Sequence, residues 1–258
     1  MDKYKGELLI IDMLDTDIKD IRTYKEYVRK IVTFDDRGDG SLEVDYVINA
    51  IVPVRYSSKH VLSGREYMIY NQEVERYALE EKNILPEVKR ILVSFGGSDP
   101  MDYTNKMDCI FDQFPECEFN IVIGPNYKEN KETMERLRKY KNVRCIWNCS
   151  ELAGYIYNAD LCIISGGITL YETSYIGTPC IVLCQVEHQI VTADMFEING
   201  CCINLKIVSD FQSLLHTIHV LRERDVRAKM SSCQKQFISD NGTNRILCLI
   251  QKIEEELK

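Results

Sequence analysis

Residues 160–182 read DLCIISGGITLYETSYIGTPCIV. The segment opens with a continuous apolar run that ends at Ser165, which is typical of a strand buried on both faces of a parallel sheet. Two glycines follow, and then a helix-length stretch ends at Gly177, a residue type that favours the left-handed end of a helix. A second apolar run comes directly after it. The segment therefore predicts a strand, a Gly-rich turn, a helix and a second strand.

The same alternation of apolar runs and amphipathic stretches continues on both sides of this segment. Six runs read as buried strands: VKRILVSF (88–95), EFNIVIG (118–124), NVRCIW (142–147), DLCIIS (160–165), TPCIVLC (178–184) and CCINL (201–205). A helix-length segment separates each run from the next, which is the spacing that parallel strands require. The sequence therefore predicts an α/β domain over residues 87–258, built on a doubly wound parallel sheet.

A shorter pattern of the same kind precedes Pro86, which marks the expected domain boundary. It consists of GELLIID (6–12), a helix-like stretch (17–30), IVTFDD (31–36) and VDYVINAI (44–51). Three short strands and one helix cannot cover both faces of a parallel sheet, so residues 1–86 predict a partial Rossmann-like lobe. We expect a further strand and Gly-rich turn ahead of it, supplied by a longer reading frame or an upstream polypeptide.

The composition excludes several classes of function. The chain has 258 residues, 45% of them apolar, and its 40 acidic and 32 basic residues give a formal charge of −8. That balance disfavours binding to nucleic acid or to an anionic bilayer. No apolar run approaches the roughly 18 residues of a membrane span, and the N-terminus lacks the plan of a signal peptide. We expect a cytoplasmic globular protein with no membrane span.

The eleven cysteines are scattered through predicted strands and helices, which is typical of buried, reduced thiols. Neither Cys145 with Cys149 nor Cys201 with Cys202 is joined by the further cysteines or histidines that a tetrahedral site needs. The sequence therefore predicts no metal and no cofactor.

Two Gly-rich turns follow predicted strands, and the first is SFGGSDP (94–100). It places Gly96, Gly97 and Ser98 ahead of a helix, where bare backbone can approach a ligand and free amides can bind phosphate. A tight turn in which Asp99 caps the helix explains the same pattern equally well.

The second turn lies in the opening segment and is the stronger candidate. Ser165, Gly166 and Gly167 end a strand with little side-chain bulk, and Thr169 lies in the first turn of the next helix. We interpret this arrangement as a diphosphate cradle. Glu172 follows one helical turn later on the same face, where its carboxylate can accept hydrogen bonds from the two ribose hydroxyls. The alternative is that Glu172 is a solvated helix residue.

A third candidate follows the next predicted strand, at His188 and Gln189. Loops at the carboxyl ends of parallel strands bind ligands, so these two side chains are candidate contacts to a hexose. A solvent-facing loop position explains His188 equally well.

Two pairs of acids follow strands of the first lobe: Asp12 with Asp15, and Asp35 with Asp36. Such a pair can serve general acid or base chemistry, and Asp12 is the candidate catalytic residue. Capping and turn roles explain Asp15 and Asp36 equally well.

The ordered set ELLIIDMLDT (7–16), IVTFDD, DYVINA with Tyr67, SFGGSDP and SGGITLYETSYIGTPCIVL (165–183) covers nearly the whole chain. It resembles the GT-B superfamily, and within it the group of the UDP-sugar hydrolase of pseudaminic acid synthesis and the spore-coat-polysaccharide glycosyltransferase-like proteins. The resemblance implies two Rossmann-like lobes, a nucleotide diphosphate held by the C-terminal lobe and chemistry at a cleft. It also implies that Asp12, Tyr67 and Gln189 face the sugar.

This resemblance leaves three interpretations open. The first is a UDP-sugar hydrolase, although this sequence has no counterpart of the His-bearing, Gly-rich loop that such hydrolases carry near their amino terminus. The second is a glycosyltransferase that uses the same donor, which the sequence DMLDT (12–16) favours. The third is a noncatalytic subunit that binds a nucleotide sugar. Without such a loop, we expect weak turnover or none.

Overall fold

The computed structural model describes residues 6–51, 60–128 and 131–258. The chain forms two compact units: a first unit from residues 1–70 and 240–258, and a second unit from residues 71–239. Each unit contains one sheet in which all neighbouring strands are parallel, so the predicted α/β class is confirmed. Within the described residues, every helix is too short or too polar to cross a membrane.

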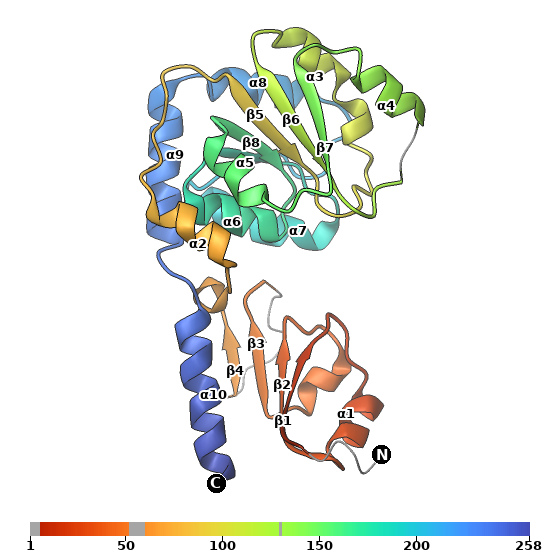
Figure 1. Ribbon diagram of the computed structural model, residues 1–258, viewed down its shortest axis with the longest axis vertical. Helices are drawn as coiled ribbons and strands as arrows, with labels where there is room; N and C mark the ends of the chain where they lie inside the picture. The colour runs from red at the N-terminus through yellow and green to blue at the C-terminus, as the bar shows by residue number, and fades with distance from the viewer. Residues whose placement is uncertain (1–5, 52–59, 129–130) are drawn as a thin grey trace. The chain divides into compact units, whose positions relative to one another are not determined.

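The first unit holds a four-stranded sheet in the order β1-β2-β3-β4 (Figure 1). Its strands are β1 (Gly6–Asp12), β2 (Val28–Phe34), β3 (Tyr46–Asn49) and β4 (Val61–Ser63). Its helices are α1 (Ile18–Tyr24), the 3-10 turns η2 (Asp39–Leu42) and η3 (Arg65–Tyr67), and α10 (Thr243–Leu257). The short strand β4 is an addition to the three strands that the sequence predicts.

Helices cover both faces of this sheet. On one face Ile11 and Ile31 of the strands are buried together with Ile21 of α1. On the other face, strand residues including Val32 form a core with the α10 residues Ile246, Ile253 and Leu257. The α10 positions are seven and four residues apart, the spacing of a single helical stripe.

The two units divide the chain differently from the expected domains 1–86 and 87–258. The C-terminal helix α10 packs on the sheet of the first unit, although it follows the second unit in the sequence. Its apolar stripe shows that it needs a partner surface, but such a stripe does not specify which sheet supplies that surface. At the other boundary, the first unit ends at Tyr70 and not near Pro86.

The second unit holds a six-stranded sheet in the order β10-β9-β8-β5-β6-β7. Its strands are β5 (Arg90–Ser94), β6 (Glu118–Ile123), β7 (Val143–Trp147), β8 (Leu161–Ile164), β9 (Cys180–Val182) and β10 (Ile203–Asn204). All six lie within the runs that the sequence predicts. Counted from β5 the order is 3-2-1-4-5-6, that of the doubly wound fold.

Helices connect and cover these strands. They are α2 (Gln72–Leu79), η4 (Thr104–Lys106), α3 (Asp108–Gln113), α4 (Lys131–Leu137), α5 (Leu152–Asn158), α6 (Ile168–Ile176), α7 (Glu187–Ile198), α8 (Gln212–Val220) and α9 (Arg224–Phe237). The buried core runs from β5 and β6 to α3 and α8, with Phe111, Phe119 and Leu214 among its fully buried members.

The direction of winding reverses at the central strand β5. Its residue Val93 pairs with Ile121 of β6 on one side and with Ile163 of β8 on the other. The connections that leave β5 and β8 therefore diverge to opposite halves of the sheet. In open parallel sheets, ligands bind in the crevice that this divergence leaves at the carboxyl ends of the strands.

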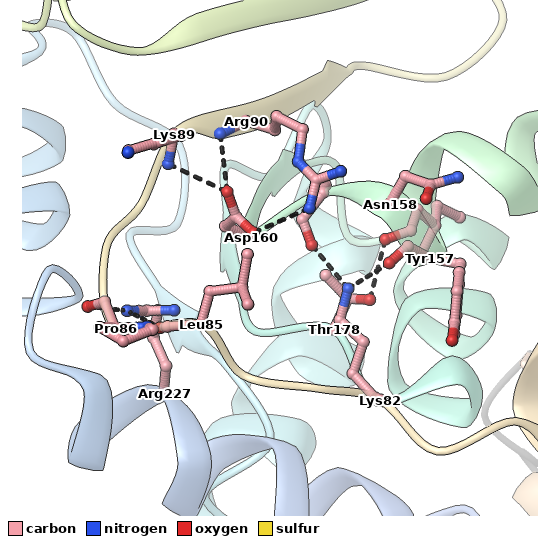
Figure 2. A network of polar contacts seen from close by, with 12 residues as sticks. Lys82, Leu85, Pro86, Lys89, Arg90, Tyr157, Asn158, Asp160, Thr178 and Arg227 are labelled. Carbon is pink, nitrogen blue, oxygen red and sulfur yellow. Dashed lines mark hydrogen bonds and ion pairs between the residues drawn. The ribbon is translucent and has the colours of Figure 1, made fainter.

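One half-buried and one buried cation, Lys82 and Arg227, attach the segment between α2 and β5 to the rest of the second unit (Figure 2). The Lys82 Nζ donates hydrogen bonds to the carbonyl oxygens of Tyr157 and Ala159 at the end of α5, the latter at 2.6 Å. The negative end of the helix dipole favours a cation at this position. Burial of the ammonium group nevertheless lowers the pKa of Lys82 to about 8.

Arg227 of α9 is fully buried and donates from Nη2 to the carbonyl oxygens of Leu85 and Pro86, at 2.9 and 3.0 Å. The Asp160 carboxylate accepts from the backbone amide of Arg90 at 2.8 Å (Figure 2). These contacts explain why the segment around Pro86 belongs to the second unit and is no linker.

Replacement of Ile253 by alanine tests the assignment of α10 to the first unit. The side chain is fully buried in the core that α10 shares with β2 and β3, so its truncation should cost roughly 2–5 kcal/mol. We expect faster amide hydrogen exchange in β2 and β3, with β5 and β8 unchanged. The neighbouring exposed residue gives the control, Lys252→Ala, which should leave both sheets unchanged. Equal effects of the two substitutions would contradict the assignment.

Candidate functional site

A cavity of about 510 Å³ lies at the carboxyl ends of β5, β6 and β7. Its walls are formed by Ser94, Gly96, Gly97, Val122, Ile123, Gly124, Pro125, Asn148, Cys149, Ser150, Leu152 and Thr169. The cavity thus joins the first Gly-rich turn to the loops after β6 and β7 and to the first turn of α6. Through Ser94, Gly97 and Thr169 it borders the crevice between β5 and β8, at which the winding of the sheet reverses.

The turn after β5 and the turn after β6 meet backbone to backbone. A Cβ atom on Gly124 would lie 2.2 Å from the carbonyl oxygen of Gly96 and 2.4 Å from that of Gly97. Real Cβ atoms do not approach backbone oxygens so closely, so only glycine fits at position 124. Gly96 itself has a φ of +75°, which also favours glycine.

Asp99 fixes the backbone ahead of η4, although the N-cap residue of that helix is Tyr103. Its buried carboxylate accepts hydrogen bonds from the backbone amides of Tyr103 at 3.0 Å and Thr104 at 2.8 Å. Ser98 is exposed in the same turn. The turn is therefore held by its own hydrogen bonds, with Gly97 and Ser98 on its open side.

The turn after β8 leaves backbone amides open at the start of α6. The Ser165 amide is occupied, because it donates to the carbonyl oxygen of Ser94 at 3.3 Å. No acceptor for the amides of Gly166 and Gly167 is found in the part of the chain that the structure describes. Gly167 precedes the helix and provides no side-chain cap. Open amides at a helix N-terminus form an anion-binding environment.

Glycine at positions 166 and 167 has two different explanations. A Cβ atom on Gly166 would lie 3.1 Å from both Cβ and the carbonyl oxygen of Gln189, so the packing of α7 explains this glycine. A Cβ atom on Gly167 would meet nothing closer than the Gln189 Nε2 at 3.8 Å, an ordinary contact. At Gly97 the nearest atom is 3.9 Å away. The fold thus has room for a methyl group at Gly97 and at Gly167.

Glu172 is half-buried on α6, and burial raises the pKa of its carboxyl group. No hydrogen bond or ion pair to its side chain is found among the described residues. A partly desolvated carboxylate without a partner is energetically unfavourable in the folded protein. Glu172 is therefore not the fully solvated helix residue of the alternative interpretation.

The third candidate pair lies in the first turn of α7. His188 is exposed to solvent. The Gln189 Oε1 accepts a hydrogen bond from the backbone amide of Gln185 at 2.8 Å. This bond leaves the amide nitrogen of the Gln189 side chain on the side of Gly167.

The acidic candidates of the first unit separate into structural and unassigned groups. Asp36 is buried and accepts hydrogen bonds from the backbone amide of Thr16 at 3.0 Å and from its hydroxyl at 2.6 Å. Asp15 forms an ion pair with Arg37 at 3.3 Å. Asp12 is exposed at the end of β1, and its chemistry keeps it a candidate.

Tyr67 lies in η3 of the first unit and packs against the core that α10 forms with the sheet. The backbone of Gly242, just before α10, is so close to Tyr67 that an added Cβ would lie 2.5 Å from its carbonyl carbon. A contact between Tyr67 and a sugar stays a prediction.

Three parts of the site are not singled out by the sequence: Gly124, residues 148–150 and Gln185. Gly124 ends the apolar run EFNIVIG, so the pattern of a strand followed by glycine was a usable signal. Asn148 has a φ of 51°, a conformation that asparagine tolerates better than most residues, but one asparagine after a strand is a weak signal. Gln185 becomes visible only through its long-range hydrogen bonds.

No cluster of metal-ligating side chains occurs within residues 6–51, 60–128 and 131–258. Two cavities of about 650 Å³ lie elsewhere, one between α9 and residues 80–84 and one along β1 and α1. The first has walls rich in side chains already bonded to backbone carbonyls, and the second is mainly apolar. Neither contains a Gly-rich turn.

Two α/β units, each built on a parallel sheet, and a crevice between Gly-rich turns in one of them are typical of the GT-B class of fold. The chain superimposes on MurG from Acinetobacter baumannii with a TM-score of 0.61 and 16% identity, over 86% of this chain and 67% of that one. It superimposes on the glycotransferase of kitacinnamycin with a TM-score of 0.66 and 12% identity, over 98% of this chain and 77% of that one. At such identities the likeness shows the fold alone.

The chain belongs to the family of the glycosyltransferase family 28 C-terminal domain, whose model matches residues 91–246, more than half of its length. It is 28% identical to the spore coat polysaccharide biosynthesis protein SpsG of Bacillus subtilis, over 98% of this chain and 78% of that protein. It is also 28% identical to the uncharacterized protein MJ1062 of Methanocaldococcus jannaschii, over 72% of this chain and 42% of that protein. The chain is therefore glycosyltransferase-like and related to a protein of polysaccharide biosynthesis.

Gly97 and Gly124 lie on either side of the contact between the turn after β5 and the turn after β6. They should differ in their tolerance of replacement by alanine. Gly124→Ala places a methyl group against two backbone oxygens and should destabilise the second unit by roughly 1–3 kcal/mol or more. Gly97→Ala enters open space at an ordinary φ and should change the free energy of unfolding by less than about 0.5 kcal/mol. Urea unfolding measures both. Equal losses of stability would show that the turns do not meet in this way.

Proposed function

We propose that the second unit binds the nucleoside diphosphate part of a UDP-sugar and that the protein transfers the sugar to an acceptor in polysaccharide biosynthesis. The observation that carries this proposal is the room left at Gly97 and Gly167. Both glycines flank the crevice between β5 and β8, and the packing of the protein requires neither. A ligand that approaches the backbone at both turns explains why side chains are absent there.

The open amides before α6 suit the diphosphate. The N–H groups of Gly166 and Gly167 and the positive end of the α6 dipole would stabilise its charge without a metal ion. During transfer, the acceptor hydroxyl oxygen forms a bond to the anomeric carbon and gives its proton to a base, while the bond between the anomeric carbon and the diphosphate oxygen breaks and the electron pair stays on that oxygen. Donors already fixed at this position would stabilise the developing charge, which lowers the barrier to transfer.

Glu172 suits the ribose. Its carboxylate lies one helical turn beyond Thr169, and Thr169 lines the cavity. An unpaired, half-buried carboxylate would accept hydrogen bonds from the two ribose hydroxyls, and the ligand would thereby supply the partners that the protein lacks. The stability lost by burying Glu172 would then be the cost of a preformed binding group.

Hydrolysis of the same UDP-sugar is the second candidate. Water would replace the acceptor hydroxyl at an unchanged donor site, and the family resemblance includes UDP-sugar hydrolases, although the sequence DMLDT (12–16) itself favours transfer. Asp12 is the candidate base in either reaction because of its position after β1. Release of UDP measured with and without an acceptor saccharide separates the two reactions. A protein that binds the UDP-sugar but releases no UDP under either condition would be a noncatalytic subunit.

Replacement of Glu172 by glutamine should separate stability from binding. The variant removes an unpaired, half-buried charge, so at pH 8 it should be at least as stable as the wild type, while its affinity for UDP should fall by roughly 1–3 kcal/mol. Burial raises the pKa of Glu172, so the folded state binds the proton more tightly than the unfolded state. Any stability advantage of the variant should therefore shrink as the pH falls through that raised pKa.

Thermal unfolding and titration calorimetry with UDP measure the two properties separately. Glu135→Gln, an exposed position on α4, is the control that should change neither property. If the Glu172→Gln variant loses stability but keeps its affinity for UDP, Glu172 does not belong to the binding site.

A further inference from the structure

Two hydrogen-bonded connections cross the end of β8. In the sheet β8 lies between β5 and β9, so the loops that follow β5 and β9 stand on either side of the turn at Gly166. The hydroxyl of Tyr103, in the loop after β5, donates to the carbonyl oxygen of Cys184 after β9 at 3.2 Å. The second connection joins Asp99 to Gln185, with the Gln185 Nε2 donating to the Asp99 Oδ1 at 3.0 Å.

Both polar atoms of the Gln185 carboxamide are used in this second connection. Besides its bond to Asp99, its Oε1 accepts from the backbone amide of Met101 at 3.0 Å. The side chain of Gln185 is buried, with 5% of its surface exposed. A buried amide with both groups satisfied has one preferred orientation, so the side chain fixes the position of its own backbone.

The backbone amide of Gln185 in turn determines how Gln189 is oriented. It donates to the Gln189 Oε1 at 2.8 Å, which turns the Gln189 Nε2 toward Gly167. The Nε2 group therefore stands beside the open amides of the turn, in the same crevice. A chain of contacts thus runs from Asp99 through Gln185 to a side-chain N–H group beside Gly167.

We propose that Gln185 is a positioning residue for the diphosphate site. It holds the carboxamide of Gln189 so that its N–H group joins the amides of Gly166 and Gly167 as a donor to the outer phosphate. This inference rests on the proposed function, because it assumes that a diphosphate occupies the turn. Asp99 and Met101 act through Gln185, and Gln185 acts through Gln189.

A comparison of UDP with UMP separates positioning from simple support of the fold. UMP lacks the outer phosphate. A misdirected Gln189 side chain should therefore lower the affinity for UDP and leave the affinity for UMP nearly unchanged. Gln185→Met keeps much of the side-chain volume but removes both hydrogen bonds. We expect it to lower the ratio of UDP to UMP affinity by roughly tenfold, about one lost hydrogen bond to a charged group.

Exchange of the donor and the acceptor between positions 185 and 99 tests whether the lost ratio of UDP to UMP affinity can be restored. Gln185→Glu places a second carboxylate against Asp99 and should lower the ratio at least as much as Gln185→Met. The pair Gln185→Glu with Asp99→Asn again places a donor against an acceptor across the same 3.0 Å contact, but it gives up the hydrogen bond that the Asp99 Oδ1 accepts from the Tyr103 amide. We expect it to recover part of the lost ratio, as an interaction between coupled residues requires.

A spectroscopic measurement on the wild-type protein does not depend on the folding of the variants. The ¹H–¹⁵N signals of the Gln189 carboxamide should shift when UDP is added and should shift much less with UMP. Equal losses of UDP and UMP affinity in every folded variant, or Gln189 signals that UDP leaves unchanged, would overturn the positioning role but not the proposed function. A wild-type protein that binds neither nucleotide would contradict the proposed function, and the role of Gln185 with it.

Discussion

The parallel pairing of β5 with β6 on one side and β8 on the other is the constraint on which the second unit depends. It brings two Gly-rich turns to adjacent strand ends while their helices leave in opposite directions. The contact between Gly124 and the carbonyl oxygens at residues 96 and 97 then sets the shape of the cavity. Thr169, in the first turn of α6, lines that cavity, and the open amides, the half-buried carboxylate of Glu172 and the oriented carboxamide of Gln189 lie on the turn before α6, on α6 itself and on α7.

The glycines of the site serve two purposes that packing distinguishes. Gly96, Gly124 and Gly166 are explained by the protein itself, through a left-handed backbone angle or a close approach. Gly97 and Gly167 have no such explanation. A site that binds diphosphate through its backbone needs both kinds of glycine, because some must bring the turns together and others must leave their surface bare.

The sequence predicts most of the second unit because fully buried parallel strands are recognisable as apolar runs. All six strands fall where the sequence predicts them, since their length and flanking glycines agree with the periodicity. The first unit is less visible. Its strand β4 has only three residues, and the apolar stripe of α10 gives no indication of the sheet that it covers. Long-range packing alone decides both features.

In the candidate site too, features set by local sequence patterns are predictable and features set by long-range contacts are not. The glycines and Thr169 stand at strand and helix ends that the pattern locates, and Glu172 follows one helical turn later, so the sequence predicts them as candidates. The sequence does not show that the Ser165 amide is occupied, or that Gln185 bonds across the sheet to Asp99. Such contacts join residues far apart in the chain, and no local pattern encodes them.

The structure of a crystal soaked with UDP tests the central claim most directly. The account predicts the diphosphate beside the backbone of Gly97 and Gly167, with the Glu172 carboxylate within hydrogen-bonding distance of the ribose. UDP bound along β1 or α9, or an empty crevice between β5 and β8 at saturating UDP, would contradict it.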